Sequence, residues 1–176
     1  MLIKVIFAGF GGQGVLSMGL NLARSAMMEG RNVTYLPSYG VEVRGGTANC
    51  TVAISDQEIA SPVASAPEFV VVMNKPSLVR FQNQLESGGM LFINTTIIDA
   101  EIVRGDIEVI RVPAGELAEK IGSAKSANMV MMGAFIKKSN LVAMSSVVEE
   151  LKNTLKGKEK LIAINEKALM AGYDLV

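Results

Sequence analysis

Apolar and polar positions along the chain fall into blocks that predict strands and helices in alternation. Residues 2–8 form an apolar run with the length of a buried strand, and residues 15–29 repeat apolar positions at helical spacing. Gly30 suits the C′ position of that helix, and residues 32–36 form a second apolar run. The opening therefore predicts a strand–helix–strand unit whose two parallel strands are buried on both faces, as in a doubly wound sheet.

The next segment departs from this alternation. Residues 47–54 and 58–61 resemble two antiparallel strands joined by the turn Ser55-Asp56-Gln57. The sheet is therefore expected to be mixed rather than purely parallel.

Alternation then resumes and gives way to helices. Further strands are predicted at residues 69–73, 90–94 and 107–112, and a helix that begins at Pro76 and ends at Gly88-Gly89 joins the first two. Helices are predicted at residues 114–121, 127–138, 144–156 and 161–171, with Gly157 and Gly172 at C′ positions. Because no linker, repeat or low-complexity tract divides residues 1–176, we predict a single Rossmann-like α/β domain. It would have a mixed, mostly parallel sheet, flanking helices and a helical C-terminal third.

Composition narrows the possible functions. The chain has 176 residues, of which 49% are hydrophobic, and its 17 basic residues balance 17 acidic ones, so no global field draws nucleic acid or an anionic membrane. It has no histidine, which removes the usual general base, zinc ligand and partner of a nucleophile. One cysteine excludes an internal disulfide and cannot hold an iron–sulfur cluster without other chains.

An uncharged stretch at residues 5–23 has the length of a membrane span but not the composition. It contains five glycines together with Gln13, Ser17 and Asn21, so we interpret it as strand, loop and helix. No basic leader precedes an unbroken apolar core, and a cytoplasmic location is predicted.

The sequence Gly9-Phe10-Gly11-Gly12-Gln13-Gly14 satisfies G-x-G-x-x-G between a predicted strand and a predicted helix. In that context backbone N–H groups and the helix dipole face an anion. The doubled Gly11-Gly12 and the amide of Gln13 favour a loop that contacts a ligand or partner. The alternative is that the glycines serve only a tight turn and close packing.

A dinucleotide site needs a second feature that is missing here. NAD-binding folds place a carboxylate after the second strand, about 20 residues beyond the glycines, to hold a ribose hydroxyl. That region reads Thr34-Tyr35-Leu36-Pro37-Ser38, and the next carboxylate is Glu42. A free-standing NAD(P)-binding oxidoreductase therefore remains an alternative, for which the glycine motif is present but the ribose-binding carboxylate is missing.

Residues 38–49 form a second polar group, in a predicted loop on the sheet where sites are often found. Tyr39, Glu42 and Arg44 are interleaved there with glycines. Arg44 offers a planar fork for a carboxylate or phosphate, and Gly45 permits close approach. Glu42 would orient that fork or pair across a subunit boundary, whereas a solvated Glu–Arg pair would contribute little.

Two further features are the segment before residue 127 and the sulfur-containing side chains. Ser123 or Ser126 is expected to cap the helix that starts at residue 127, with Lys125 a candidate for an anion and Asn128 for contact with a neighbouring loop. Cys50 is expected to be a small buried hydrophobe. Core filling is the expected role of the helical methionines, which include Met27, Met28, Met129, Met131, Met132 and Met144.

The glycine loop and the stretch Pro37-Ser-Tyr-Gly-Val-Glu-Val-Arg-Gly-Gly-Thr-Ala-Asn49 together resemble the gamma subunit of 2-oxoacid:ferredoxin oxidoreductases. Val41 stands where many relatives have proline, which leaves the role of the loop intact. The other matching stretches are Ser61-Pro62, Met73-Asn74-Lys75-Pro76-Ser77, Asn94-Thr95-Thr96, Pro113-Ala114, Ala127-Asn128-Met129 and Asn165-Glu166-Lys167-Ala168. The resemblance covers nearly the whole chain and implies the same fold.

The resemblance implies a heteromeric enzyme that oxidatively decarboxylates a 2-oxoacid to its acyl-CoA and passes electrons singly to ferredoxin. In that family thiamine diphosphate, with Mg²⁺, lies between alpha and beta subunits, and iron–sulfur clusters lie in beta or in a ferredoxin-like delta subunit. This chain would then bind no cofactor alone, carry no catalytic residue and be inactive in isolation, where a homodimer is possible. The run Gly45-Gly46-Thr47-Ala48-Asn49-Cys50 is most similar to 2-oxoglutarate enzymes, with branched-chain and pyruvate enzymes next.

Carried onto this chain, the resemblance also marks the positions expected to contact a partner subunit or the phosphate-bearing part of coenzyme A. They are Gly11, Gly12, Gln13, Gly14, Tyr39, Glu42, Arg44 and Gly45. An assembly subunit whose glycine loop binds only protein remains the other alternative.

Overall fold

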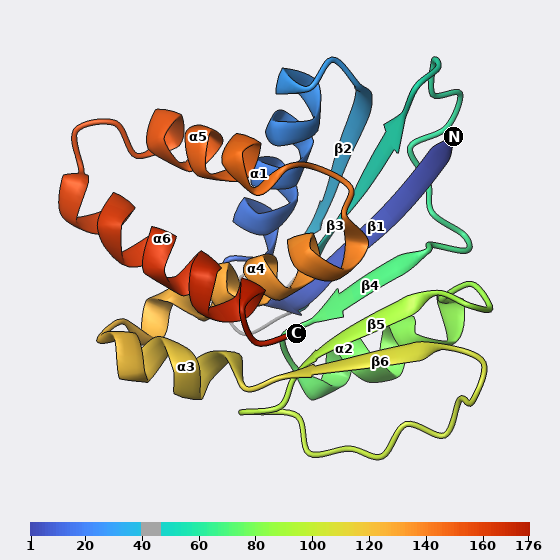
Figure 1. The fold of residues 1–176 in the computed structure, drawn as a ribbon. Coiled ribbons are helices and arrows are strands. Elements are labelled where there is room, and N and C mark those ends of the chain that lie inside the picture. The colour runs from blue at the N-terminus through green and yellow to red at the C-terminus, as the bar shows by residue number, and fades with distance from the viewer. Residues whose placement is uncertain (40–46) are drawn as a thin grey trace.

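The computed structural model describes residues 1–39 and 47–176, and their strands form one sheet in the order β2-β3-β1-β4-β5-β6 (Figure 1). The strands are β1 (Leu2–Phe10), β2 (Asn32–Tyr39), β3 (Thr47–Ser55), β4 (Phe69–Val72), β5 (Met90–Asn94) and β6 (Glu108–Val112). Strands β1, β4, β5 and β6 are parallel neighbours, whereas β3 runs antiparallel to both β1 and β2. The predicted mixed, mostly parallel sheet is confirmed.

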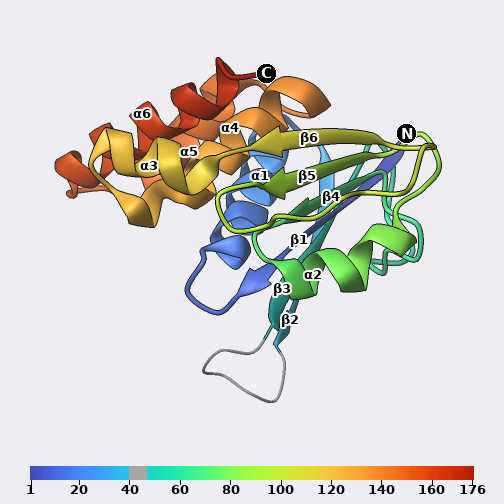
Figure 2. The same ribbon diagram turned by 90° about the horizontal axis from the view of Figure 1, so that it is seen from below.

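Helices cover both faces of the sheet, as the doubly wound pattern requires (Figure 2). On one face lie α1 (Val15–Met28), α4 (Ala127–Ser139), α5 (Met144–Thr154) and α6 (Glu159–Tyr173), with α3 (Ala114–Ile121) packed beside α4 and α6. On the other face lies α2 (Lys75–Phe81), which continues into a short 3-10 helix, Gln82–Gln84, and therefore ends before the predicted Gly88. The helical C-terminal third is confirmed.

The predicted strand at residues 58–61 is wrong, and β3 explains why. Its residues already pair with β1 on one edge and with β2 on the other, for example Val52 with both Val5 and Tyr35. A strand doubling back on β3 therefore has no free edge to join. For the same reason β1 and β2 run in the same direction but are not paired neighbours, so the predicted strand–helix–strand opening is corrected to a unit with β3 inserted.

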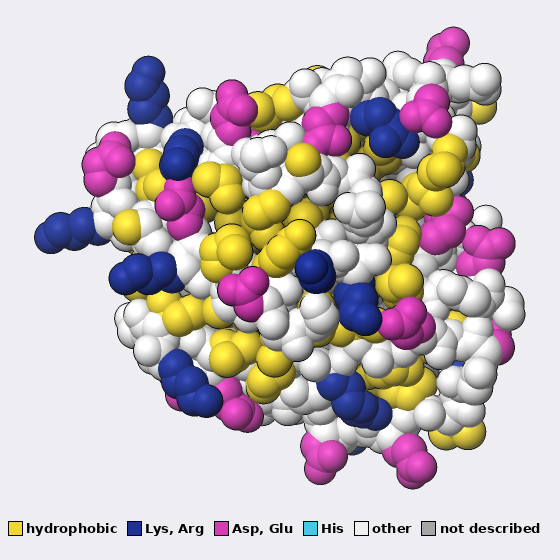
Figure 3. Space-filling view, viewed as in Figure 1, with side chains coloured by type: hydrophobic (Ala, Val, Ile, Leu, Met, Phe, Trp, Pro, Cys, Tyr) yellow, Lys and Arg dark blue, Asp and Glu magenta, His cyan; other side chains and the backbone are white. Residues whose placement is uncertain are grey.

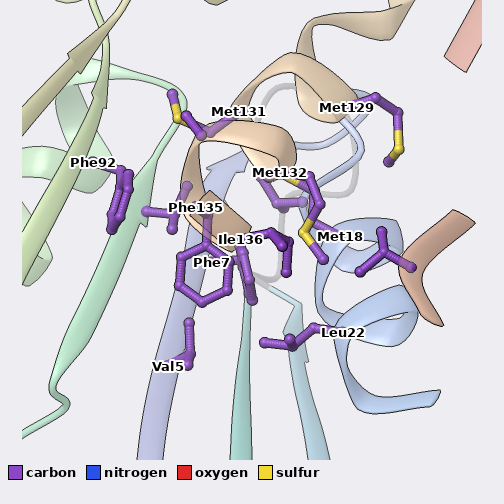
Figure 4. Close-up of a cluster of buried hydrophobic side chains, with 14 of the residues drawn as sticks. Val5, Phe7, Met18, Leu22, Phe92, Met129, Met131, Met132, Phe135 and Ile136 are labelled. Carbon is purple, nitrogen blue, oxygen red and sulfur yellow. The ribbon is translucent and has the colours of Figure 1, made fainter. Parts of the chain in front are cut away.

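The core on the helical face is centred on Phe135 of α4 (Figure 4). Its ring meets Phe7, Phe69 and Phe92 edge to face at centroid distances of 5.4, 5.7 and 5.5 Å. Edge-to-face geometry aligns positive ring edges with negative ring faces and adds to the burial of apolar surface. This one side chain therefore ties α4 to the three strands β1, β4 and β5.

The methionines divide into two groups. Met129, Met131 and Met132 of α4 are buried, as expected for core filling. Met27 and Met28, by contrast, are 61% and 43% exposed at the end of α1, so for these two the prediction is wrong. They occupy the last turn of the helix.

Gly172 does not have the predicted C′ role, because it lies inside α6. A Cβ placed on Gly172 would stand 1.8 Å from the carbonyl oxygen of Val130, and one placed on Gly133 would stand 1.9 Å from that of Leu169. The two glycines therefore let the backbones of α4 and α6 touch where the helices cross. Gly30 and Gly157, with φ of 79° and 84°, do have the left-handed conformation expected after α1 and α5.

Candidate functional site

A cleft of about 430 Å³ opens at the carboxyl edge of the parallel strands. It lies where the chain leaves β1 for α1 on one face and leaves β4 for α2 on the other, the switch point at which α/β sheets bind ligands. The residues that line it come from the segments that follow β1 and β4, from the end of β5 and the turn after it, from α3, from the 3-10 turn Ala124–Ser126 and from the start of α4. They are Gly12, Gln13, Met73, Asn94, Thr96, Ile97, Gly115, Glu119, Ala124, Lys125, Ala127 and Asn128.

The glycine loop reaches this cleft in a conformation that needs glycine at three positions. Gly12 and Gly14 have φ of 95° and 75°, which L side chains rarely adopt. A Cβ on Gly9 would lie 2.7 Å from Gln13 Oε1, and one on Gly14 would lie 2.3 Å from Asn128 Nδ2. Gly12 has open space around it, so its backbone is accessible from the cleft, whereas Gly9 and Gly14 serve close packing.

Gln13 turns its side chain into the protein and clamps the loop. Its Oε1 accepts from the backbone nitrogen of Phe10 at 2.7 Å and from Asn74 Nδ2 at 3.3 Å. Its Nε2 donates to the carbonyl oxygen of Met73 at 3.2 Å. Asn74 in turn caps α2, because its Oδ1 accepts from the backbone nitrogen of Ser77 at 2.8 Å. The amide of Gln13 therefore fixes the loop against the end of β4.

The N-termini of α1 and α4 lie next to each other at the cleft. Asn128 Nδ2 donates to the carbonyl oxygen of Gly14 at 3.4 Å, which confirms the expected contact with a neighbouring loop. Ser126 stands at the N-cap position of α4, but its hydroxyl pairs with that of Ser123 at 3.0 Å and makes no capping hydrogen bond, so the predicted cap is wrong. Neither helix has a side-chain cap or an acidic residue in its first turn.

Sequence reasoning missed the residues that follow β5. Asn94, 1% exposed, lines the cleft, and its Oδ1 accepts from the backbone nitrogen of Thr96 at 3.3 Å. Thr96 Oγ1 accepts from the backbone nitrogens of Gly115 and Glu116 at 3.0 and 3.2 Å, so it caps α3 from the turn that follows β5. Asn94-Thr95-Thr96 was one of the family-like stretches, and its position after a predicted parallel strand was the available signal.

Three residues of the second predicted group, Glu42, Arg44 and Gly45, lie outside the described residues. Tyr39 is the last residue of β2, and its backbone pairs with Ala48 of β3, which pairs in turn with Gly9 of β1. The described residues on either side of the gap, Tyr39 and Thr47, therefore lie at the same edge of the sheet as the glycine loop. The structure places Gly12 and Gln13 on the cleft and Gly11 and Gly14 beside it.

Neither strand that pairs with β1 provides the ribose-binding carboxylate of a dinucleotide fold. The parallel neighbour of β1 is β4, which is followed by Met73, Asn74 and Lys75. On its other side β1 pairs with β3, whose first residues at this edge are Thr47, Ala48 and Asn49. The geometry of these residues agrees with the incomplete NAD signature seen in the sequence.

Cys50 is fully buried in β3, as predicted. Burial raises the pKa of its thiol to about 12, against the opposing effect of nearby hydrogen bonds. A thiol with that pKa is neutral near pH 7, so Cys50 packs as an apolar side chain.

Within residues 1–39 and 47–176, no helix is long and apolar enough to cross a bilayer. No group of three or more His, Cys, Asp or Glu side chains is placed to hold a metal ion in that part of the chain.

Comparison with known proteins identifies the family. The model of the pyruvate ferredoxin/flavodoxin oxidoreductase family matches residues 4–175. Among curated relatives, ketoisovalerate oxidoreductase subunit VorA of Methanothermobacter thermautotrophicus is 42% identical over 98% of this chain but 36% of its own length. This chain therefore spans about a third of that relative. Subunit KorC of the 2-oxoglutarate synthase of Methanothermobacter marburgensis is 35% identical, over 98% of this chain and 96% of its own.

Solved structures share the fold at lower identity. The gamma subunit of a keto/oxoacid ferredoxin oxidoreductase from Geobacter sulfurreducens has a TM-score of 0.84 at 22% identity, over 98% of this chain and 96% of its own. A 2-oxoglutarate:ferredoxin oxidoreductase from Magnetococcus marinus, solved with 2-oxoglutarate, coenzyme A and succinyl-CoA, has a TM-score of 0.92 at 21% identity, over 99% of this chain and 31% of its own. The chain therefore belongs to the pyruvate ferredoxin/flavodoxin oxidoreductase family, in which it corresponds to the gamma-type subunit.

Proposed function

We propose that this chain works as the gamma subunit of a heteromeric enzyme that oxidises a 2-oxoacid to its acyl-CoA and reduces ferredoxin. The observation that carries the proposal is the match of the family model to residues 4–175, together with a cleft at the switch point of the sheet. The polar side chains that line the cleft are amides, a hydroxyl, a lysine and a glutamate, a set suited to binding and orienting a ligand.

The redox and decarboxylation chemistry would come from partner subunits. Iron–sulfur clusters need several thiolates, and this chain has one cysteine, which is buried in the sheet. We therefore place the clusters in a beta or ferredoxin-like delta subunit, and thiamine diphosphate with Mg²⁺ between alpha and beta subunits. Ferredoxin is the proposed acceptor, and the proposed location is the cytoplasm.

The surface also suits a subunit of a larger assembly. Hydrophobic side chains gather between the areas where α5 and α6 lie in Figure 1, on the face shown in Figure 3. On α6, Leu161 and Met170 are 47% and 42% exposed. Contiguous exposed apolar surface is typical of protein contact sites.

The glycine loop and the second polar group would act at the edge that carries the cleft. Gly11, Gly12, Gln13 and Gly14, with Tyr39, Glu42, Arg44 and Gly45, are proposed to contact a partner subunit or the phosphate-bearing part of coenzyme A. The hydrogen bonds of Gln13 support two distinct roles within the loop. The amide of Gln13 fixes the conformation of the loop, and the backbone near Gly12 would contact the ligand or partner.

Two 2-oxoacids are candidates for the substrate. The sequence prediction is 2-oxoglutarate, and one relative of matching length is a 2-oxoglutarate synthase subunit at 35% identity. The relative at 42% identity belongs to a ketoisovalerate oxidoreductase, which favours a branched-chain 2-oxoacid as the second candidate.

Co-expression tests the proposal. The chain, tagged, is produced with the reading frames that neighbour its gene, and the purified material is assayed for ferredoxin reduction with coenzyme A and either 2-oxoglutarate or ketoisovalerate. We expect a stable complex that contains a thiamine-diphosphate-binding chain and prefers one of the two acids. A chain that purifies alone, or a complex without 2-oxoacid-dependent reduction, would contradict the proposal.

A further inference from the structure

A second pocket, of about 260 Å³, lies on the helical face of the sheet, with walls from α1, α5 and α6. Lys125 and Asn128 line both this pocket and the cleft, so they mark the border between the two. We call the second one the helix pocket. Pockets that enclose a whole small molecule measure about 300–1,000 Å³. The helix pocket is smaller, a size that suits a single long side chain.

Glu150 of α5 presents an unpaired carboxylate oxygen to the helix pocket. Its side chain is 8% exposed, and its Oε1 accepts from Arg24 Nη1 at 3.1 Å and from Thr154 Oγ1 at 2.7 Å. Within residues 1–39 and 47–176 nothing donates to its Oε2. That atom is also not among the fully enclosed polar atoms without a partner, so it reaches the surface of the pocket. This nearly buried carboxylate therefore keeps one oxygen for a donor from outside the chain.

The negative charge of Glu150 is only partly compensated within the chain. Arg24 is 48% exposed, so water screens its guanidinium, and its contact with the carboxylate is through Oε1. A carboxylate removed from water is stable when it is both paired and fully hydrogen-bonded.

A second side chain of the same pocket also lacks a donor. Asn21 is 8% exposed, and its Nδ2 donates to the carbonyl oxygen of Val147 at 3.5 Å, whereas its Oδ1 is enclosed without a partner. Asn21 and Glu150 therefore both have a spare acceptor, and the chemistry that this pocket lacks is that of hydrogen-bond donors.

The rest of the pocket is apolar in a way that suits a long basic side chain. Met129 and Leu151 are buried, and Leu20 and Leu155 are half-buried, so they offer apolar surface on four sides of the polar groups. Basic side chains bury their methylene stems along such surface and keep the charge for a polar partner. Arginine fits better than lysine, because its guanidinium has five donors and is more weakly hydrated.

We propose that the helix pocket receives an arginine side chain of a partner subunit. The guanidinium would donate to Glu150 Oε2 while the stem packs on Leu20 and Leu155. The existence of that partner rests on the proposed function. Helices α5 and α6, which line the pocket, also flank the apolar surface in Figure 3, so the arginine would be anchored within a larger contact area. Arginines in such positions are common among the residues that dominate the affinity of an interface.

The chemistry of the pocket is tested on the isolated chain, with butylguanidinium as a mimic of the arginine side chain. Its binding is followed through the amide NMR signals of the chain. We expect the signals around Glu150 to shift, and the response to be lost in Glu150→Gln, which keeps the shape of the side chain but removes its charge. Glu149→Gln is the matched control, because Glu149 is the preceding residue of α5, is exposed and does not line the pocket.

Binding of the partner is tested by titrating each variant into the other subunits, produced without this chain. We expect Glu150→Gln to weaken binding about tenfold or more. Ser17→Trp should do the same by filling the pocket from an exposed position of α1, and it serves where Glu150→Gln does not fold. Arg24→Met breaks the internal ion pair but leaves the carboxylate for the partner, so it should bind at least as tightly as the unsubstituted chain.

The outcomes separate the pocket from the proposed function. Probe binding that depends on Glu150, together with weaker assembly of Glu150→Gln and Ser17→Trp, supports the proposal. Equal weakening by Glu150→Gln and Arg24→Met would show that the ion pair is merely structural and would overturn it. Probe binding with unchanged assembly overturns it as well, because the pocket would then take a free cation, and dimerisation of the isolated chain that depends on Glu150 would assign the pocket to a second copy. If the unsubstituted chain binds no other subunit, the proposed function fails, and absence of a probe response at millimolar concentration is the separate result that overturns the pocket.

Discussion

The side-chain nitrogen of Gln13 donates to the carbonyl oxygen of Met73 across the point where β1 and β4 diverge toward helices on opposite faces of the sheet. The same side chain accepts from Phe10 and Asn74. The side chain of Gln13 therefore links the ends of β1 and β4 and holds the glycine loop in place.

Gln13→Ala should lower the free energy of unfolding by about 2 kcal/mol, because three partly buried hydrogen bonds are lost at once and each contributes about 0.5–1.5 kcal/mol. Urea denaturation of the isolated chain measures this change in the free energy of unfolding. Gln84→Ala is the control, since Gln84 makes one exposed hydrogen bond to Arg80 and should change stability by less than about 0.5 kcal/mol. Equal effects of the two substitutions would mean that Gln13 does not clamp the loop.

Gly133→Ala and Gly172→Ala should each destabilise the chain by about 3 kcal/mol or more. The new methyl group would collide with a carbonyl of the facing helix, and backbone cannot move aside as a flexible side chain does. Alanine otherwise favours helices by up to about 1 kcal/mol, so the clash must exceed that gain. Gly105→Ala is the control, because a Cβ there meets nothing within 4 Å, and its Tm should lie within a few degrees of that of the unsubstituted chain. Unchanged thermal stability of the two helix variants would contradict the close crossing of α4 and α6.

Arg24 of α1 pairs with Glu150 of α5 at 3.1 Å, and the carboxylate is 8% exposed against 48% for the arginine. Arg24→Met should therefore cost about 1–3 kcal/mol, less than a fully buried pair because water screens the exposed guanidinium. In a Glu150→Gln background the same change should cost clearly less. The pair Lys152–Glu166, 55% and 33% exposed, offers the contrast: Lys152→Met should cost less than about 0.5 kcal/mol. A double-mutant cycle that shows no coupling free energy between Arg24 and Glu150 would contradict this prediction.

Cys50 should make stability fall with rising pH in alkaline solution. Burial raises the pKa of its thiol from 9.0 to about 12, so between those pH values the unfolded thiol loses its proton while the folded one keeps it. The folded state then binds more protons than the unfolded state, and the free energy of unfolding decreases by up to about 1.4 kcal/mol per pH unit. The contribution is complete below pH 9 and is lost toward pH 12. Comparing the chain with Cys50→Ala from pH 8 to 11 isolates it from the lysines and tyrosines, and parallel curves would refute it.

The fold could be predicted from the sequence where local pattern and topology agree. The apolar runs that became β1, β4, β5 and β6 and the periodic helices α1, α4, α5 and α6 were found within a few residues. The insertion of β3 between β1 and β2 was not, because a strand's partners depend on contacts far along the chain. Gly172 was misplaced for the same reason: a glycine at a helix crossing and a glycine after a helix look alike in sequence.

The site was predictable in part. Glycine spacing located the loop, and Asn128 was expected to contact a neighbouring loop, which the structure shows to be the glycine loop. The role of Asn94 was not foreseen, because it depends on a buried amide with one engaged oxygen, which only the arrangement of β5 and Thr96 defines. Contact of Gln13 with a ligand or partner stays a prediction; the three hydrogen bonds of its amide inside the protein could not be predicted from the sequence, because two of them depend on residues about 60 positions away.

The most direct measurement of the central claim compares two preparations made from the same neighbouring genes, one with this chain and one without it. Each is assayed for the rate at which ferredoxin is reduced in the presence of a 2-oxoacid and coenzyme A. We predict that omission abolishes the reaction, and that adding the purified chain restores it in proportion to the amount bound. An equal rate in both preparations would contradict the assignment of this chain as a working subunit of the enzyme.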